Sequence, residues 1–485
     1  MTMWYGSIPW STLADLTIHG RRVPVSYRGM FAYQSRTLMI MYWPVKVMQR
    51  VASFYLRQQF ADPSFIRTLH ISWKEDVLTA LERGSRDIEH TDLKTLSDKE
   101  LKRSFLGFVK KFRHAWTESI FHDSFDLAGG DIIERELIRG TPRVSVAQVE
   151  TLLAPVEPLV IQRERTELAS IAALAQRSAG LRQLVLANTW TTIHKNHTAF
   201  YGRVDSHRGT WKWMLNDYER IVDMPFAWFA GRIRYYLTHP DELQRDRSIP
   251  RSLKNATATK RMLIKKLRLT PRQRAIIELL STVQVWRDER KAMSQAGSIT
   301  MRRFAHEFSR RSTIPITLLR NAFWWEIDDI TKGSPQFKKV LRLRTIGLVH
   351  RTESSTTRTL ENGPRSAMYQ KLLSNMISTE NLHGMPAFTG IVRGRAHYMM
   401  TQSDFPRFKP GEILIAPNTR PEYVSIMKKA GAIVTEEGGI TSHAAIVSRE
   451  LCIPAIVGVQ GVLEAFRNGD LVEVDAIKGT VKKVR

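Results

Sequence analysis

Apolar residues recur at intervals of three and four along much of the first 350 residues. Residues 275–293 read AIIELLSTVQVWRDERKAM, and their apolar stripe consists of Ile276, Leu279, Leu280, Val283 and Trp286. Such a stripe is the face that an amphipathic helix buries against a core. It predicts a helix over this segment.

Two further segments carry signals for helix boundaries. Residues 97–121 have the same period and open on Ser97, with Glu100 three positions later, which is the pattern of a capping box. Another periodic segment contains Pro155 and Pro158, and proline inside a helix predicts a break into two helices. Strand signals are sparse, so we expect the region before residue 351 to be mostly α-helical.

The polarity changes after residue 350. Residues 352–366 are polar with a single leucine and contain Asn-Gly-Pro, which predicts an exposed loop. Together with the polar segment that ends near residue 383, this loop predicts a hinge over residues 351–383. The expected domain boundaries are therefore 1–350, 351–383 and 384–485.

Residues 384–485 alternate between short apolar runs and short helical segments. The apolar runs predict strands within residues 387–400, 411–417, 431–435 and 453–459, and a closing hairpin within 470–484. Helices are predicted over residues 421–430 and 441–451. This interleaving predicts a small α/β domain. The expected fold class is thus multidomain, a mostly α-helical N-terminal region followed by a small α/β domain.

Composition separates the same two regions. The chain has a net charge of +26, and residues 1–384 hold 60 Lys and Arg against 37 Asp and Glu. All 12 Trp also precede residue 385. Positive surfaces attract phosphate backbones, and residues 251–274 form a dense basic run. Nucleic-acid binding is therefore an alternative function, although we recognise no nucleic-acid-binding motif.

Cysteine and histidine spacing predicts neither an internal disulfide nor a metal site. Cys452 is the single cysteine, which favours a reducing compartment. His194 and His197 are three positions apart but have no carboxylate partner nearby in the sequence. The N-terminal residues lack the order of a signal peptide, and no apolar run is long enough to span a bilayer. We expect a soluble cytoplasmic protein without membrane contact.

One turn between a predicted strand and a predicted helix concentrates the candidate chemistry. Gly438 and Gly439 allow a tight turn, Thr441 can cap the helix that follows, and His443 falls in its first turn. The positive end of the helix dipole disfavours the imidazolium form and favours a neutral, nucleophilic ring. The same amide groups favour a bound phosphate. By local physics alone, a surface or capping role for His443 is the alternative.

The string GGITSHAAIVSR resembles the active-site signature of the phosphohistidine domain shared by phosphoenolpyruvate (PEP)-utilising enzymes. The paired glycines, the threonine two positions before the histidine, the small residues after it and the later arginine are all present. The resemblance extends over roughly residues 384–485. It implies a swivelling domain whose His443 takes a phosphoryl group at one active site and carries it to a second.

The resemblance also implies roles for the neighbours of His443. The phosphate-binding residues would be Thr441, Gly438, Gly439, Ser442 and Arg449. Thr419 and Arg420 match a family turn at the end of a neighbouring strand and would border the site, with an ordinary turn and helix cap as the alternative.

The layout resembles the acceptor-binding and histidine domains of rifampicin phosphotransferase and PEP synthase-related proteins. It implies a phosphotransferase component whose helical region binds an unknown small-molecule acceptor. The sequence has no Walker-type glycine-lysine loop, so ATP or PEP, with Mg²⁺, is expected through a separate ATP-binding (nucleotide-grasp) or PEP-binding subunit. Trp286, Arg287 and Arg290 are candidate acceptor-binding residues, with a charged face on a packed helix as the alternative. A phosphohistidine carrier that catalyses nothing is a further alternative function.

Overall fold

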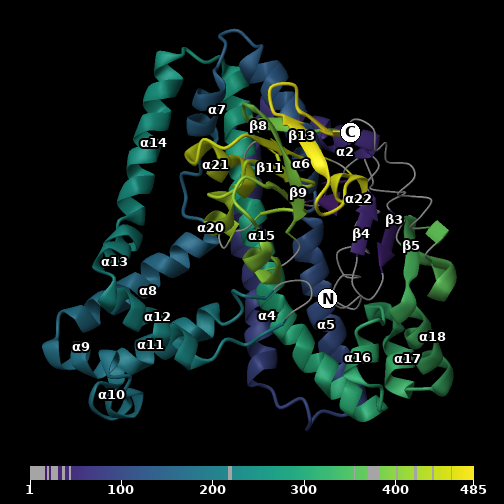
Figure 1. The fold of residues 1–485 in the computed structure, drawn as a ribbon. Coiled ribbons are helices and arrows are strands. Elements are labelled where there is room, and N and C mark those ends of the chain that lie inside the picture. Colours follow the sequence, from purple (N-terminus) through teal and green to yellow (C-terminus); the bar gives the residue numbers. More distant parts are fainter. Residues whose placement is uncertain are drawn as a thin grey trace. The chain divides into compact units, whose positions relative to one another are not determined.

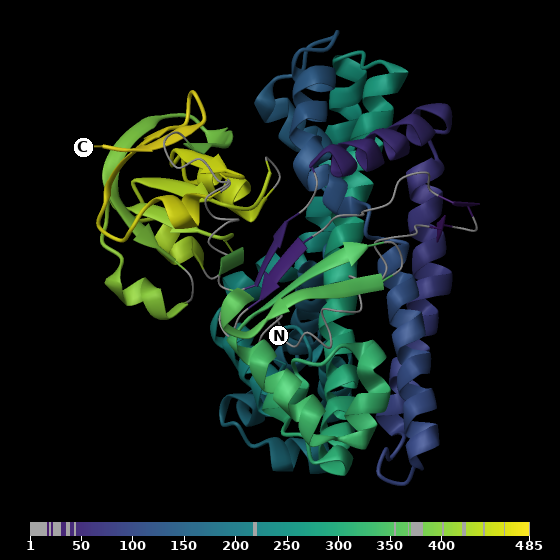
Figure 2. The same cartoon turned by 90° about the vertical axis from the view of Figure 1, so that its right-hand side faces the viewer.

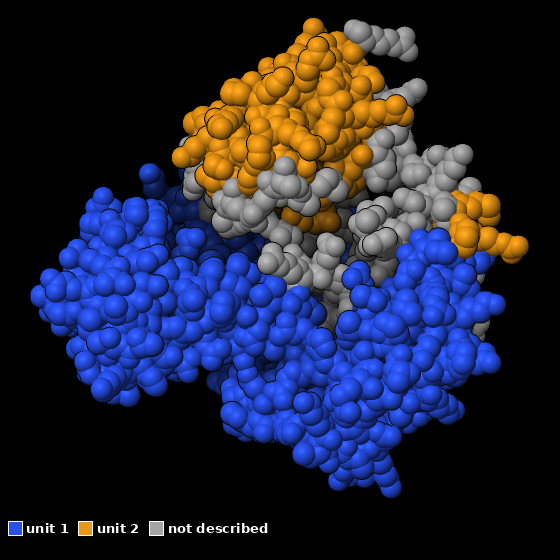
Figure 3. All heavy atoms as spheres, turned by 60° about the horizontal axis from the view of Figure 1, so that its bottom comes forward, with its two compact units in different colours: residues 1–122, 147–363 blue, residues 123–146, 364–485 orange. Residues whose placement is uncertain are grey.

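The computed structural model in Figure 1 describes most of the chain. The described residues are 17–18, 21–22, 31–34, 39–42, 45–216, 221–353, 356–366, 368–369, 382–399, 402–419, 423–439, 442–459 and 461–484. The chain divides into two compact units, residues 1–122 with 147–363 and residues 123–146 with 364–485 (Figure 3). We call the first the helical unit, and we call residues 382–484 the C-terminal domain. The boundaries expected at residues 350 and 383 stay predictions.

Helices dominate the chain up to residue 346, which confirms the prediction of a mostly helical N-terminal region. They are α2 (Val45–Ala61), α3 (Phe65–Ser72), η1 (Trp73–Leu78), α4 (Thr79–His90), α5 (Asp98–Thr117), α6 (His122–Ile133), η2 (Glu134–Ile138), α7 (Val146–Leu153), α8 (Val160–Gln176), α9 (Ala179–Leu186), α10 (Trp190–Asn196), α11 (Thr198–Trp211), α12 (Phe226–Thr238), α13 (Pro240–Arg247), α14 (Ile249–Lys266), α15 (Pro271–Ser312), α16 (Ile316–Leu319), η3 (Trp324–Glu326), α17 (Ile327–Lys332) and α18 (Pro335–Ile346).

The helix α15 is the central helix of the helical unit. It runs for 42 residues and begins with Pro271 behind a capping box formed by Thr270 and Gln273. The predicted apolar stripe faces the interior, where Trp286 is fully buried. Gly297 allows close packing with α5, because a Cβ there would lie 2.5 Å from the Phe112 ring. The other helices of the unit therefore pack around this long helix.

Both helix boundaries predicted from local signals are confirmed. Ser97 caps α5 by accepting a hydrogen bond from the Glu100 amide, and the Glu100 carboxylate accepts one from the Ser97 amide at 2.8 Å. The break predicted at Pro155 and Pro158 separates α7, which ends at Leu153, from α8. These features depend on residues close in sequence.

A four-stranded antiparallel sheet also belongs to the helical unit. Its strands lie in the order β4 (Met39–Tyr42), β3 (Phe31–Gln34), β5 (Leu348–Glu353) and β6 (Thr356–Asn362). Figure 2 shows the N-terminal strands beside the hairpin of β5 and β6. The short strands β1 (Thr17–Ile18) and β2 (Arg21–Arg22) pair separately.

The loop predicted for residues 352–366 is wrong over residues 352–353, which end β5, and over residues 356–362, which form β6. Its pairing partner β5 pairs in turn with β3, where Phe31 lies opposite Arg351. The threonines of this segment favour an extended backbone because they are β-branched. The partner strand β3 is remote in the sequence, so the local polar pattern indicated a loop.

The C-terminal domain is built on an eight-stranded sheet of order β7-β14-β13-β9-β10-β11-β12-β8. Its elements are β7 (Leu382–His383), β8 (Met385–Phe388), β9 (Ile391–Tyr398), η5 (Gln402–Arg407), β10 (Ile413–Ala416), α20 (Val424–Met427), β11 (Ala432–Thr435), α21 (His443–Glu450), β12 (Ala455–Val457), α22 (Val462–Ala465), β13 (Leu471–Asp475) and β14 (Thr480–Lys483). The predicted α/β domain is confirmed, and so are its strands, helices and closing hairpin.

The four strands from β9 to β12 run parallel to one another. Along β10, Leu414 and Ala416 enter a core shared with Ala444 of α21, whereas Ile413 and Ile415 enter a second core on the opposite face. Strands buried on both faces are typically continuous apolar runs, as the sequence shows here. The parallel strands therefore form the rigid centre of the domain.

The two ends of this sheet are neighbours in the chain, because only Gly384 separates β7 from β8. The Gly384 amide donates to the Gly479 carbonyl at 2.9 Å. A Cβ at Gly384 would lie 2.5 Å from Val459 and 2.8 Å from Ile456. Glycine is therefore needed where the sheet curls round to bring its ends together.

A buried carboxylate ties three helical segments to α15. The Glu289 side chain is 3% exposed, and its oxygens lie 2.6 Å from His70 Nε2 of α3 and 3.1 Å from Lys74 Nζ of η1. Arg163 of α8 also pairs with it. Burial would raise the pKa of Glu289, but the His70 hydrogen bond and the charges of His70, Lys74 and Arg163 outweigh burial and lower the pKa to about 2.

We predict that Glu289→Gln lowers the free energy of unfolding of the helical unit by roughly 1–3 kcal/mol, because it removes the counter-charge of the partly exposed Lys74 and Arg163 and weakens the hydrogen bond to the buried His70. The stabilisation by the carboxylate is fully present above its unfolded pKa of 4.5 and is lost as the pH falls toward the folded value of about 2. The difference in the free energy of unfolding between wild type and variant should therefore become smaller as the pH falls through this range. Urea unfolding followed by tryptophan fluorescence measures it.

The matched control for this prediction is Glu278→Gln, on the same helix. Glu278 pairs with Arg67, whose side chain is 65% exposed, and exposed pairs contribute about 0–1 kcal/mol. Equal losses in the two variants would contradict the role assigned to Glu289.

Candidate functional site

The candidate site lies at the carboxyl edge of the parallel strands, where the loops after β10 and β11 meet. The amide of Glu436 donates to the Ala416 carbonyl at 3.0 Å, and the amide of Glu437 donates to the Pro417 carbonyl at 2.8 Å. The Asn418 side-chain amide donates to the Glu437 carboxylate at 3.2 Å. In open α/β sheets, this edge is where ligands bind.

The turn that leads into α21 depends on Gly438. Its φ of +116° lies in a region that side chains strongly disfavour. A Cβ at this position would also lie 2.9 Å from Ser442 Cβ and 3.0 Å from Ser442 Oγ. By contrast, Gly439 has no described atom within 4 Å of such a Cβ. Of the two paired glycines, Gly438 is therefore the one that the backbone requires.

The helix α21 is capped by Ser442, whose hydroxyl accepts a hydrogen bond from the Ala445 amide at 3.3 Å. The prediction that Thr441 is the cap is therefore wrong by one residue. Both residues carry a hydroxyl group suited to capping, so the sequence did not distinguish them. Thr441 itself lies outside the described residues, as does Arg420.

His443 is the first residue of α21, which confirms its predicted position in the first turn. The first amide groups of a helix have no partner within it and form the positive end of its dipole. Behind His443, the side chains of Ala444, Ala445 and Val447 are buried in the core. The small apolar residues thus fix the helix to the sheet and hold its first turn at the strand edge.

Arg449 anchors the far part of α21. It lies six positions after His443, which corresponds to about 9 Å along a helix. Its Nε atom donates to the Ala387 carbonyl of β8 at 2.8 Å, and the side chain is half-buried. Thr419, in the loop after β10, is also buried. The phosphate-binding role of Arg449 and the bordering role of Thr419 stay predictions.

Three further residues at this edge were not found by sequence reasoning. Glu436 Oε1 accepts a hydrogen bond from the Gly461 amide at 3.0 Å, which links the loops after β11 and β12. Asn418 links the loops after β10 and β11. Thr435 is fully buried, and its hydroxyl has no hydrogen-bond partner within the described ranges. Each of these polar residues ends or closely follows a buried apolar strand, which was the available signal.

The candidate acceptor-binding residues lie in the helical unit. Trp286 is fully buried, and its ring centroid lies 4.6 Å from that of His122. Arg290 is buried, and its Nη1 atom donates to the Ser119 carbonyl at 3.2 Å. Arg287 is half-buried. The interior therefore already uses Trp286 and Arg290, and the acceptor-binding role of these three residues stays a prediction.

Three wider features of the described residues complete the picture. No group of three or more His, Cys, Asp or Glu side chains that could hold a metal ion is found among them. His194 contacts the Tyr201 ring with centroids 4.3 Å apart. None of the described helices is long and apolar enough to cross a membrane.

Comparison with known protein families gives a match that includes this edge of the sheet. A family model described as the mobile domain of PEP-utilising enzymes matches residues 408–479, from just before β10 to the turn before β14. Residues 408–479 are similar to this mobile domain. The match includes the whole turn from Gly438 to Arg449, so the resemblance expected from the sequence is confirmed.

The curated relatives match about a fifth of the chain. Over 102 residues, the chain is 46% identical to a probable phosphoenolpyruvate synthase from Pyrococcus abyssi, which covers 21% of this chain and 12% of that protein. Over 108 residues, it is 39% identical to the uncharacterized phosphotransferase YvkC from Bacillus subtilis, covering 22% and 13% of the two chains. The chain therefore spans only about an eighth of the length of these relatives.

A solved structure, the holo-form of Thermococcus kodakaraensis aconitase X, aligns with 22% of this chain and 98% of that chain. The sequence identity is 20% and the TM-score is 0.18. This likeness is too low to carry an argument.

We predict that Gly438→Ala destabilises the C-terminal domain by about 1–3 kcal/mol, because the substitution forces a strained φ and crowds Ser442. The matched variant Gly439→Ala should change stability by less than about 1 kcal/mol, because no described atom crowds that position. Thermal unfolding, followed by hydrogen exchange in β10 to β12, measures both. Equal destabilisation by the two variants would contradict the distinct role assigned to Gly438.

Proposed function

We propose that the chain is a phosphotransferase component in which the C-terminal domain carries a phosphoryl group on His443 to an acceptor bound by the helical unit. The observation that carries this proposal is the position of His443 at the first residue of α21, within the segment that matches the mobile domain of PEP-utilising enzymes. The names of the relatives, phosphoenolpyruvate synthase and phosphotransferase, support the same reaction class.

The local backbone supports a phosphoryl carrier. Amide groups at the start of α21 and the positive end of its dipole favour an attached dianion. The hydrogen bonds of Glu436, Glu437 and Asn418 hold the adjoining loops in place. Such fixed dipoles stabilise developing negative charge without having to reorganise during transfer.

Two displacements at phosphorus make up the proposed cycle. In the first, an imidazole nitrogen of His443 forms an N–P bond while the P–O bond to the donor breaks, and its electron pair leaves with the donor oxygen. In the second, an acceptor oxygen forms a new P–O bond while the N–P bond breaks, and its electron pair returns to the imidazole. The acceptor proton is released to solvent. Covalent catalysis of this kind splits one transfer into two steps.

The donor site is proposed to lie on a separate subunit that binds ATP or PEP. Such a subunit would also hold Mg²⁺, which neutralises charge on the transferred group. The matched segment is the part of the family common to this chain and its relatives. A split arrangement and a cytoplasmic location stay predictions.

The test is to incubate the purified full-length chain with ATP labelled in its β- or γ-phosphate, or with labelled PEP, each with and without lysate from its source. We expect acid-labile, base-stable label that disappears in His443→Ala and persists in the control His194→Ala. Label that appears only with lysate would support a separate donor subunit. A folded wild-type protein that stays unlabelled throughout, or label retained in His443→Ala, would refute the proposal.

A chase experiment separates the enzyme from a carrier that catalyses nothing. After labelled protein is isolated, small molecules from the lysate are added and the released label is identified. Label transferred to a small molecule supports the phosphotransferase, and label transferred only to another protein supports the carrier. Salt-dependent binding to duplex DNA in an otherwise unlabelled protein would instead favour the nucleic-acid alternative.

A further inference from the structure

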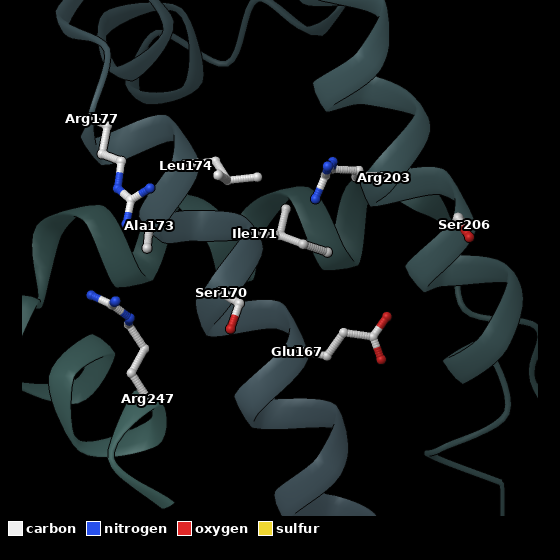
Figure 4. Close-up of a pocket in the computed structure, with 9 residues that line it drawn as sticks. All are labelled: Glu167, Ser170, Ile171, Ala173, Leu174, Arg177, Arg203, Ser206 and Arg247. Carbon is white, nitrogen blue, oxygen red and sulfur yellow. The ribbon is translucent and has the colours of Figure 1, made fainter. Parts of the chain in front are cut away.

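A cavity of about 430 Å³ opens in the helical unit, where α8, α11 and α13 pack together. Arg177, at the end of α8, Arg203 of α11 and Arg247 of α13 all line it. In Figure 4, the side chains of Arg177 and Arg247 are directed toward each other, and Arg203 lies beyond Leu174 and Ile171. Three guanidinium groups from three different helices thus border one space.

These arginines are not neutralised by the protein that the structure describes. Across its described ranges, none of the three guanidinium groups has a hydrogen-bond or ion-pair partner. The three arginines are exposed residues, so water screens their mutual repulsion. Their guanidinium donors therefore stay available to an anion that enters the cavity.

The acidic side chains around the cavity are already engaged. Glu167, which also lines it, lies 3.1 Å from His207 Nδ1 and accepts a hydrogen bond from Trp211 Nε1 at 2.9 Å. Asp246, next to Arg247 in the sequence, accepts a hydrogen bond from the Tyr236 hydroxyl at 2.6 Å. These contacts hold both carboxylates in place and keep them from pairing with the three arginines.

Glu242, one turn earlier on α13, is also engaged, because it pairs with Arg245. This ion pair lies on the same helix as Arg247. The Glu242 carboxylate therefore pairs with Arg245, whereas Arg247 lines the cavity.

The α8 side chains that form the floor of the cavity are mostly apolar, and they indicate which class of ligand would fit. Ile171 and Ala173 are buried, and Leu174 is half-buried, all on the face of α8 that lines the cavity. The volume is within the range of small-molecule sites, which are mostly apolar with a few polar groups that fix orientation. Inorganic phosphate alone would leave this floor uncovered.

We propose that this cavity binds a small organic anion, whose phosphate or carboxylate group is held by Arg177 and Arg247 and whose apolar body lies on Leu174 and Ile171, toward Arg203. Guanidinium groups suit this role because their planar donors match phosphate and carboxylate oxygens in pairs. Glu167, fixed at the rim, disfavours a second negative group at its end of the cavity. The site would therefore select ligands with charge at one end only.

The test is a calorimetric titration of the full-length chain with phenyl phosphate, benzoate, inorganic phosphate and uncharged phenol. We expect saturable binding of phenyl phosphate or benzoate, weaker binding of inorganic phosphate and none of phenol. Arg247→Ala should weaken binding about tenfold or more, since hydrogen bonds between charged groups are lost. The control Arg182→Ala removes an exposed arginine of α9 outside the cavity and should leave affinity unchanged.

The relative affinities identify the acidic group, because tighter binding of phenyl phosphate indicates a phosphate ester and tighter binding of benzoate indicates a carboxylate. The proposal is overturned if no anion binds saturably, if phenol binds as well as the anions, or if Arg182→Ala weakens binding as much as Arg247→Ala. Unchanged thermal unfolding of both variants shows that they are folded. The titration needs neither His443 nor a phosphoryl donor, so its failure and that of the phosphotransfer proposal are distinguishable.

Discussion

Burial on both faces of the strands β9 to β12 is the constraint on which the C-terminal domain depends. Parallel strands covered on both sides must send their connecting loops out at their ends. The loops after β10, β11 and β12 consequently meet at one edge, where backbone and side-chain hydrogen bonds join them. The helix that begins with His443 inherits its position from this packing.

The helical unit solves a different problem, because its interior contains charge as well as apolar surface. Glu289 is buried among His70, Lys74 and Arg163, so the contacts of one carboxylate join α15 to three other segments. At the opposite extreme, the arginines of the cavity between α8, α11 and α13 have no such carboxylate. Among its described residues, the same unit thus pairs a buried carboxylate with cations in one region and exposes arginines without a carboxylate partner in another.

Local signals account for what the sequence predicted well. The capping box of α5 and the proline break before α8 involve residues a few positions apart, and the strands of the C-terminal domain are continuous apolar runs. The turn from Gly438 to His443 was found for the same reason.

Features that depend on distant residues were not predictable. The strand β6 belongs to a sheet that includes β3, and β3 lies near the beginning of the sequence. The cavity arginines are separated by 26 and 44 positions, and nothing in their local sequence marks them as neighbours. Even at the turn, Thr441 and Ser442 both carry a hydroxyl group suited to capping, so the local sequence does not decide that Ser442 is the cap.

The closure of the sheet around Gly384 has a consequence for contact with other chains. An exposed edge strand offers unpaired amide and carbonyl groups to any extended segment that meets it, and long edges invite aggregation. Here the two edges are strands of two and four residues that meet at one glycine. A side chain at this position would crowd Val459 and Ile456. Glycine therefore lets both edge strands of the sheet stay short and lie next to each other in the chain.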